Sequence, residues 1–343
     1  MTPFPTFGAA RAALTERAVI FARRAGRLFP RVYFDRDGDY RHTLLLVGSG
    51  RSGTSWVPDV INYDHSYRYL YEPFHSRHVP AARDWLPRQY VRIDDDEPRR
   101  SDLASSIFTG RFRNAYADAY NRCVVVHRRL VKDTRLQLAL GWIRKRFVGM
   151  PMIYLMRHPC AVVNSRIQLG RDCDLARMFF SQPQLMEDHL EPFRGEMERA
   201  RDDFERHVFI WCVENYVPMR QLHAGDAHLI FYENVCENPE GELQRLAAFL
   251  GAAFDERAMR NVGKASVQAR KYHGGRTSAI VTGASLVEAW KTYVSAERVK
   301  RAVEILRLFG LEAIYDEDPR PRAQSGHAMF SPSSNGPTVQ ASR

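Results

Sequence analysis

The fold is decided by the stretch Leu44-Leu45-Leu46-Val47-Gly48-Ser49-Gly50-Arg51-Ser52-Gly53-Thr54-Ser55-Trp56. Its four apolar residues predict a short buried strand, its glycines predict a tight turn, and the amphipathic run that begins at Thr54 predicts a helix. A strand, a glycine turn and a helix N-terminus bring free backbone N–H groups and the positive end of the helix dipole to one point. Because glycine has no Cβ, the backbone of the turn can approach a ligand closely. We therefore expect an anionic group to bind here.

This turn differs from the Walker A loop of nucleotide-hydrolysing proteins. In that motif, Lys and then Ser or Thr follow the last glycine directly. Here Gly53 is followed by Thr54, and the cation, Arg51, lies inside the loop. A Mg²⁺-dependent kinase would therefore lack the lysine that contacts the γ-phosphate. A turn without a ligand is the plainer alternative, but one cation, three glycines and four hydroxyl residues exceed what a turn needs.

Composition limits the classes of protein to which the chain can belong. At 343 residues and 45% hydrophobic content, it fits one large α/β domain with insertions. The formal net charge of +10 suits an anionic ligand, a nucleic acid or an acidic membrane surface. The basic residues are spread along the chain without interleaved aromatic residues, so we expect no nucleic-acid partner. A non-catalytic binder of anions or nucleic acid stays as an alternative.

Cysteine content and hydropathy bear on the location of the protein. The five cysteines are scattered and show no metal-ligand spacing, which is typical of a reducing compartment. No apolar run reaches the roughly 18 residues that span a bilayer, and the N-terminal residues show no signal-peptide pattern. These patterns predict a cytoplasmic protein without a metal ion.

The pattern outside the central stretch predicts three parts. Residues 1–41 form a helical preamble, in which an arginine-rich amphipathic helix either packs on the domain or makes peripheral contact with a membrane. Residues 42–317 form the main domain, with polar insertions at about 76–122 and 171–206. Residues 318–343 are rich in proline, serine and glycine, which predicts a disordered tail.

Two further predicted strands end in residues that suit a reaction site. The strand Tyr69–Tyr71 runs into Glu72, and a carboxylate just beyond a strand end lies where α/β folds place their chemistry. The strand Pro151–Met156 runs into Arg157, and Ser165 follows eight residues later in the expected helix. A guanidinium binds phosphate with two parallel hydrogen bonds, and a hydroxyl adds a neutral donor. Arg157 and Ser165 are therefore candidates for a second anion site.

Taken together, these motifs resemble those of a known family. The segment Arg51–Trp56 resembles the 5′-phosphosulfate loop of sulfotransferases that use 3′-phosphoadenosine-5′-phosphosulfate (PAPS). The pair Arg157 and Ser165 is similar to their 3′-phosphate motif, and Leu70–Pro73 is similar to the carbohydrate-type members. The resemblance covers about residues 42–310. It implies a three-layer α/β fold like that of P-loop NTPases, with a central, mainly parallel sheet flanked by helices.

The resemblance also implies which residues bind the nucleotide. Tyr232, at the end of the predicted strand 228–232, corresponds to a residue beside the adenine, and the basic loop at 263–285 corresponds to one that closes over the 3′-phosphate. The family has glycine after the Arg-Lys pair of that loop, whereas this chain has Tyr272. PAPS is then the co-substrate and 3′-phosphoadenosine-5′-phosphate (PAP) the product, without a metal ion. The implied binding residues are Arg51, Ser52, Gly53, Thr54, Ser55, Trp56, Arg157, Ser165, Tyr232, Arg270 and Lys271.

The expected reaction moves a sulfuryl group to an acceptor hydroxyl. The resemblance implies that Glu72 is the general base and that Arg51 neutralises charge on the leaving 5′-phosphate; His75 and Asp133 stay as alternative bases. We expect Asp133 mainly to N-cap the next helix, at Gln137–Phe147. The Leu-Tyr-Glu-Pro step favours a carbohydrate or glycolipid acceptor, whose specificity is expected to lie in the two insertions. An ATP-dependent small-molecule kinase stays as the alternative enzyme.

Overall fold

A five-stranded sheet organises the computed structural model, which describes residues 33–251, 254–262 and 286–322. A small second sheet pairs β1 (Phe34–Asp35) with β4 (Val125–Val126). In the large sheet the strand order is β3-β5-β2-β6-β7, and every neighbouring pair is parallel. The predicted α/β class with a mainly parallel sheet is confirmed. The strands of the large sheet are β2 (Thr43–Gly48), β3 (Arg68–Tyr71), β5 (Arg129–Asp133), β6 (Met152–Met156) and β7 (His228–Phe231).

The strand β2 lies at the centre because both of its faces are apolar. All six of its residues are buried, and successive side chains point to opposite faces of the sheet. Leu45 and Val47 pack into one hydrophobic cluster, whereas Leu44 and Leu46 pack into the other. A parallel strand that is buried on both faces reads as an unbroken apolar run, which is why this strand could be predicted from the sequence.

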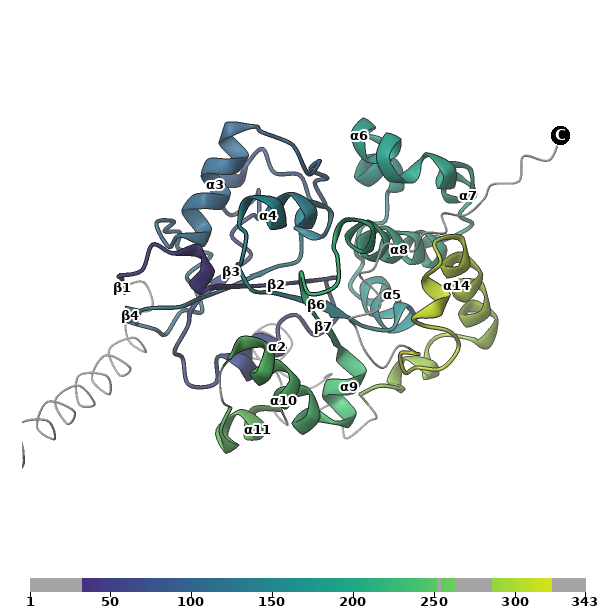
Figure 1. The fold of residues 1–343 in the computed structure, drawn as a ribbon. Helices are drawn as coiled ribbons and strands as arrows, with labels where there is room; N and C mark the ends of the chain where they lie inside the picture. The colour runs from purple at the N-terminus through teal and green to yellow at the C-terminus, as the bar shows by residue number, and fades with distance from the viewer. Residues whose placement is uncertain (1–32, 252–253, 263–285, 323–343) are drawn as a thin grey trace, which may run out of the picture.

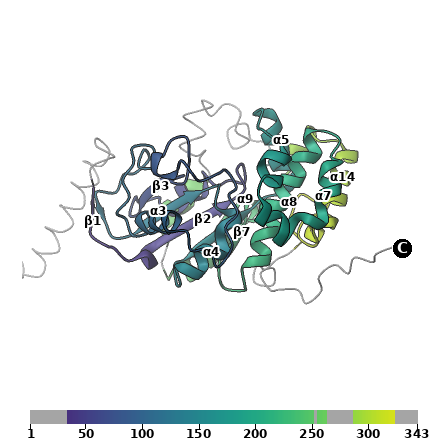
Figure 2. The same cartoon turned by 90° about the horizontal axis from the view of Figure 1, so that it is seen from above.

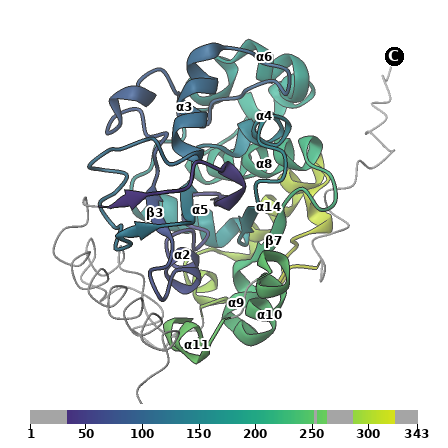
Figure 3. The same ribbon diagram turned by 60° about the vertical axis from the view of Figure 1, so that its left-hand side comes forward.

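Helices cover both faces of the sheet, so the domain has three layers (Figure 1). In Figure 2, α5, α8 and α14 lie together at one end of the sheet, and these helices contact one another. Figure 3 shows α9, α10 and α11 grouped on the side opposite α3 and α4. One face carries α3 (Pro98–Phe108), α4 (Leu140–Arg146), α5 (Pro159–Gln168), α8 (Asp203–Gln221) and α14 (Ala296–Leu308). The other carries α2 (Val57–Ile61), α9 (Tyr232–Glu237), α10 (Pro239–Leu250) and α11 (Glu256–Val262).

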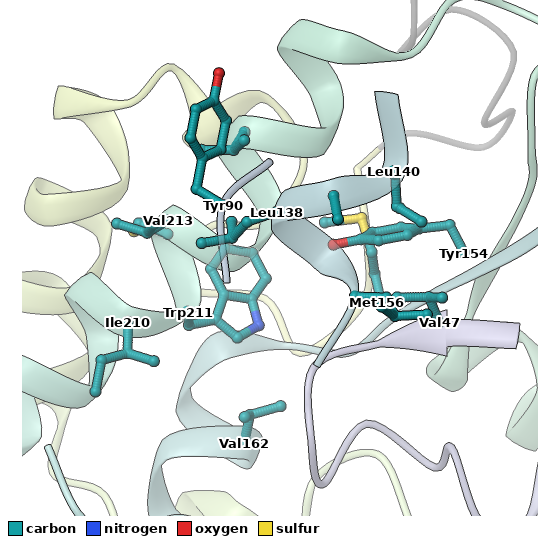
Figure 4. Packing of buried hydrophobic residues seen from close by; sticks show 14 of the residues in the cluster. Val47, Tyr90, Leu138, Leu140, Tyr154, Met156, Val162, Ile210, Trp211 and Val213 are labelled. Carbon is teal, nitrogen blue, oxygen red and sulfur yellow. The ribbon is translucent and has the colours of Figure 1, made fainter. Parts of the chain in front are cut away.

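The core of the larger helical layer is built around α8. Trp211 of α8 and Tyr154 of β6 are both fully buried, and Figure 4 shows both rings among the packed side chains. The indole Nε1 of Trp211 donates to the carbonyl oxygen of Arg157 at 3.1 Å. The hydroxyl of Tyr154 donates to the carbonyl oxygen of Glu214 at 2.7 Å. Buried polar groups need such partners, and these two bonds attach α8 to β6 and to the residue that follows it.

Several helix ends form where local sequence signals predict them. The side chain of Asn238 caps α10, which ends at Gly251 with a left-handed φ of 58°. The side chain of Ser295 caps α14. Both helices have an acidic residue in the first turn, which stabilises the positive end of the helix dipole.

The first helix of the domain begins later than expected. The sequence predicts its start at Thr54, whereas α2 begins at Val57. The cause is the turn before it, because the carbonyl oxygen of Gly53 accepts hydrogen bonds from the N–H groups of both Trp56 and Val57. Residues 53–56 therefore belong to the loop that follows β2.

Both predicted insertions contain helices. The segment 76–122 contains α3, and 171–206 is a chain of short helices that includes α6 (Pro183–Leu185) and α7 (Arg194–Glu198). The predictions for residues 1–32, for Arg270 and Lys271, and for the tail beyond residue 322 lie outside the described residues. The short 3₁₀ and π segments are η1 (Tyr40–His42), η2 (Pro80–Ala82), η3 (Gln137–Ala139), η4 (Ala176–Phe180), η5 (Met186–Leu190), η6 (Glu191–Phe193), η7 (Ala289–Thr292) and η8 (Leu311–Ala313).

Candidate active site

The candidate residues gather at one edge of the sheet. Because the five strands are parallel, their carboxyl ends lie along the same edge. Each strand ends in, or runs into, a residue or loop that the sequence marks as functional. Across this edge the order is Glu72 after β3, Asp133 at the end of β5, the loop Gly48–Trp56 after β2, Arg157 after β6 and Tyr232 after β7.

The loop after β2 is held in a conformation that most residues avoid. Arg51 has a left-handed φ of 82°, and Gly53 has a φ of 89°. The N–H group of Ser52 donates to the carbonyl oxygen of Ser49 at 3.0 Å, which closes the turn. A non-glycine residue at positive φ costs about 1–3 kcal/mol, and such strain concentrates at functional sites.

Gly53 is required at its position because it lies against Tyr232. A Cβ at residue 53 would be 2.5 Å from the ring atom Cδ2 of Tyr232. The ring of Trp56 meets the same Tyr232 ring edge-on, with 5.7 Å between the centroids. Gly53, Trp56 and Tyr232, which the resemblance implies as binding residues, therefore lie together at the base of the loop.

Arg157 joins this loop to the strands β6 and β7. Its Nη1 donates to the carbonyl oxygen of Arg51 at 3.1 Å, and its guanidinium lies 4.1 Å from the ring centroid of Tyr232. The Nε of Arg51 donates to the hydroxyl of Ser165 in α5 at 2.9 Å. The structure thus brings together the two anion-binding candidates that the sequence places more than 100 residues apart.

The electrostatics of this cluster favour a bound anion. Partial desolvation, together with repulsion from Arg157 and Arg171, lowers the pKa of Arg51, although the residue keeps an exposed surface. An arginine still keeps its proton, so the cluster holds several positive charges. Ser52 is fully buried, and its hydroxyl has no hydrogen-bond partner among the described residues. A buried hydroxyl without a partner is costly, and an anion in the loop would supply one.

The other hydroxyl residues of the loop differ in exposure. Thr54 is buried, and Ser55 is half-buried. Both follow Gly53 in the turn that precedes α2. The resemblance implies that both contribute to the same anion site.

Glu72 lies at the other end of the edge, in a dense ionic cluster. The residue has a left-handed φ of 43°. One carboxylate oxygen accepts from Lys132 Nζ at 2.6 Å and from the hydroxyl of Thr134 at 3.1 Å, and the other accepts from Arg135 Nη1 at 2.6 Å. Burial opposes ionisation of Glu72, but the two cations outweigh it and hold the pKa well below its ordinary value. Glu72 is therefore ionised, and in this arrangement it is a weak base.

The two alternative bases have different environments. Burial, with a contribution from Arg135, lowers the pKa of His75 to about 4, so its imidazole is neutral at neutral pH. Burial raises the pKa of Asp133 to about 6. A neutral imidazole offers a lone pair, whereas Asp133 is fully enclosed and accepts hydrogen bonds from the N–H groups of Phe74 and Arg135.

The prediction that Asp133 caps the next helix is wrong. The residue before η3 is Leu136, and no side chain caps that helix. The carboxylate of Asp133 instead binds the N–H of Phe74 at 3.0 Å, which fixes the turn that carries Glu72. Phe74 lies near Asp133 because β3 pairs with β5, with Tyr71 in register with Lys132, the residue before Asp133.

Sequence reasoning missed a buried carboxylate that lies behind the loop after β2. Glu214 lies in the middle of α8 and has no solvent exposure. It accepts a hydrogen bond from the hydroxyl of Ser49 at 2.6 Å and forms ion pairs with Arg88 and Arg166. The available signal is an acidic residue directly after the apolar run Val208–Val213.

Comparison with known proteins identifies the family. The chain matches the model of the sulfotransferase family over residues 44–256, so it belongs to that family and is a transferase of sulfuryl groups. The family implies a sulfate donor. No curated protein matches the chain. Within the described residues, no helix is long and apolar enough to cross a membrane.

Several solved structures are similar to this chain at low sequence identity. The sulfotransferase domain from the curacin biosynthetic pathway is 14% identical, covers 77% of this chain and 96% of its own, and has a TM-score of 0.41. The sulfotransferase domain of the Synechococcus PCC 7002 olefin synthase is 14% identical, with coverage of 82% and 96% and a TM-score of 0.42. Sulfotransferase STF9 from Mycobacterium avium is 12% identical, with coverage of 87% and 82% and a TM-score of 0.44.

Proposed function

We propose that the protein transfers a sulfuryl group from PAPS to the hydroxyl of a carbohydrate or glycolipid acceptor. The observation that carries the proposal is the position of Arg157, which binds the backbone of the loop and lies over Tyr232. In this proposal the loop holds the 5′-phosphosulfate, Arg157 and Ser165 hold the 3′-phosphate, and Tyr232 lies beside the adenine. The carbohydrate class rests on the Leu-Tyr-Glu-Pro step at residues 70–73.

The proposed reaction is an in-line displacement at sulfur. The acceptor oxygen forms a bond to sulfur while the bond from sulfur to the bridging phosphate oxygen breaks, and PAP leaves. The acceptor proton passes to a base. Positioning and charge stabilisation dominate such transfers. Arg51 stabilises the charge that develops on the leaving phosphate, and it acts electrostatically because it does not give up its proton.

Glu72 is the proposed base, and its ionic cluster restricts how it acts. With Lys132 and Arg135 in contact, its carboxylate accepts a proton only as the acceptor hydroxyl becomes acidic in the transition state. A second candidate is His75, because its neutral imidazole is available at neutral pH. The two residues lie three positions apart on the same turn.

Nucleotide binding tests the donor assignment. In the parent protein, calorimetry should detect PAP binding that is tighter than binding of AMP, which lacks the 3′-phosphate, or of ATP. Replacement Arg157→Ala should weaken PAP binding about 10- to 100-fold, because hydrogen bonds between charged groups are worth about 1.5–3 kcal/mol. The affinity for AMP should change far less.

A matched control removes an arginine from the opposite edge of the sheet. Arg144 pairs with Asp226, which lies just before β7 begins. Arg144→Ala should leave PAP binding unchanged. Equal affinity of the parent protein for PAP and AMP would refute the 3′-phosphate assignment. Tighter binding of ATP than of PAP, together with Mg²⁺-dependent transfer of phosphate, would favour the kinase alternative.

A further inference from the structure

The strongest unexplained feature of the molecule is the cluster around Glu214. One carboxylate oxygen accepts from the hydroxyl of Ser49 and from Nη2 of Arg166, each at 2.6 Å. The other accepts from Nε of Arg88 at 2.6 Å. Four separate parts of the chain meet at this fully buried side chain: the loop after β2, the helix α5, the helix α8 and the insertion at 76–122.

The Glu214 cluster is charged and buried, so its side chains must keep their positions. Burial disfavours ionisation of Glu214, but Arg166 and Arg88, with the Ser49 hydroxyl, outweigh burial and lower its pKa to about 2. The carboxylate is therefore ionised at neutral pH. A buried charge tolerates neither a missing partner nor a displaced one, because the low local dielectric makes an unpaired charge expensive.

Glu214 acts on the residues where the loop leaves β2. Ser49 is the first residue after that strand, and its carbonyl oxygen accepts the bond that closes the 49–52 turn. On the preceding residue, the carbonyl oxygen of Gly48 accepts from Gln137 Nε2 at 2.8 Å. Two side chains thus fix the start of the loop: Gln137 holds Gly48, and Glu214 holds Ser49.

Arg88 links the same carboxylate to the insertions. Its backbone has a left-handed φ of 59°, a conformation that a non-glycine residue adopts only when its surroundings compensate. The carbonyl oxygen of Arg88 accepts from Gln182 Nε2 at 3.1 Å, and the N–H of Tyr90 donates to Gln182 Oε1 at 2.9 Å. The segment at 88–90 is therefore held against the second insertion, at 171–206.

Ionic contacts strengthen this connection between the insertions. The guanidinium of Arg92 pairs with Glu187 and Asp188, and the hydroxyl of Tyr90 donates to Asp188 at 2.8 Å. The two insertions accordingly form one body on the side of the sheet that carries α8. This body contacts the loop after β2 through Arg88, Glu214 and Ser49.

We propose that Glu214 is a positioning residue, which sets the geometry of the sulfate-donor loop and couples it to the two insertions through Arg88. The inference rests on the proposed function in one respect, namely that the loop 48–56 binds the donor. Glu214 touches neither substrate nor the reacting atoms; it acts through Ser49. A change in the insertions is then transmitted to donor binding.

The test is a set of charge-removing variants with PAP as the probe. Glu214→Gln keeps the size of the side chain and removes its charge, and it should weaken PAP binding about 10- to 100-fold, since small displacements of a binding loop have effects of this size. Arg88→Gln should weaken PAP binding less. The double variant should be no weaker than Glu214→Gln alone, because Arg88 acts through Glu214.

The control is another buried glutamate of the same helix. Glu205 is buried in α8 and pairs with Arg301 of α14, away from the loop. Glu205→Gln should change PAP affinity less than about twofold, even where thermal unfolding shows lower stability. With an acceptor found by a screen with labelled PAPS, Glu214→Gln should raise the KM for PAPS more than it lowers kcat, a division that a general loss of stability would not produce.

The outcomes separate this inference from the proposed function. If the parent protein does not bind PAP, the proposed function fails. If the parent binds PAP and Glu214→Gln binds it equally well, the positioning role is refuted. Additive effects of Arg88→Gln and Glu214→Gln would refute the coupling. Where Glu214→Gln does not fold, Ser49→Ala replaces it, and unchanged PAP affinity in Ser49→Ala would overturn the proposal.

Discussion

Two buried carboxylates of this protein have the same kinds of partner but differ in their access to the site. Each glutamate binds two cations and one hydroxyl, and each has a lowered pKa. The partners of Glu72 are Lys132, Arg135 and Thr134, and those of Glu214 are Arg166, Arg88 and Ser49.

The difference lies in where each cluster is placed. Glu72 follows β3 at the carboxyl edge of the sheet, and 10% of its side chain is exposed. Glu214 lies behind the loop, inside α8, with no exposed side-chain surface. In the proposed function a proton passes to the first carboxylate from a bound acceptor, whereas the second, which has no exposed surface, is proposed only to hold its neighbours. The same local chemistry therefore suits catalysis in one place and positioning in the other.

The largest effect that this comparison predicts is on turnover. Glu72→Gln should lower kcat about 10²- to 10⁴-fold, the usual contribution of a general base. PAP affinity should change little, because Glu72 lies on the β3 side of the loop and the proposed nucleotide contacts lie on the β6 side. Steady-state rates and calorimetry with PAP provide the two measurements.

Glu214→Gln should show the opposite division of effects between kcat and donor affinity. That variant should lose donor affinity and keep more of its kcat. Full activity of Glu72→Gln would move the base to His75 or Asp133, and His75→Asn and Asp133→Asn would then identify which of them acts.

A smaller effect is expected from Gly53→Ala, which disturbs the donor side and leaves the Glu72 cluster intact. The new Cβ would meet the ring of Tyr232 at 2.5 Å, in addition to the cost of a positive φ. We expect a loss of unfolding free energy of about 1–3 kcal/mol and weaker PAP binding.

Gly251 provides the matched control for this substitution. It also has a positive φ, but a Cβ there would meet no atom of the described residues within 4 Å. Gly251→Ala should therefore lose only about 1 kcal/mol and bind PAP normally. Urea unfolding and calorimetry on both variants separate backbone strain from the contact with Tyr232. Equal PAP affinity in the two variants would contradict the role of that contact.

The donor side of the site could be predicted from sequence because its signals are local. A glycine turn follows one apolar strand, and Arg157 follows another, so each motif can be recognised without knowledge of its neighbours. The parallel order of the strands then brings the loop, Arg157 and Tyr232 to one edge. Arg51 and Ser165 meet for the same reason, since α5 begins at that edge.

The Glu214 cluster could not be predicted because its contacts are distant in sequence. Arg88 and Glu214 are separated by 126 positions, and neither belongs to a recognisable motif. From the sequence alone, a glutamate in a helix such as α8 could equally lie on an exposed face. The packing of α8 against α5 is what buries Glu214. The prediction that Asp133 caps a helix failed for a related reason. The hydrogen-bond partner of Asp133, the N–H of Phe74, lies just beyond the end of the neighbouring strand β3.

The smallest expected effect is a flat pH dependence, and it decides between the candidate bases. A base works when deprotonated, so activity is lost as pH falls through its pKa in the free enzyme. Because Lys132 and Arg135 hold the pKa of Glu72 well below its ordinary value, kcat/KM should stay constant from about pH 8 to about pH 5 if Glu72 is the base. Asp133 as the base would give an acid limb near pH 6, and His75 one near pH 4. Initial rates measured from about pH 8 down to about pH 3.5, with circular dichroism at each pH to confirm folding, distinguish the three, because this range includes the limb near pH 4 expected for His75. A limb near pH 6 that disappears in Asp133→Asn would remove Glu72 from catalysis and leave it, like Glu214, as a residue that only holds its neighbours.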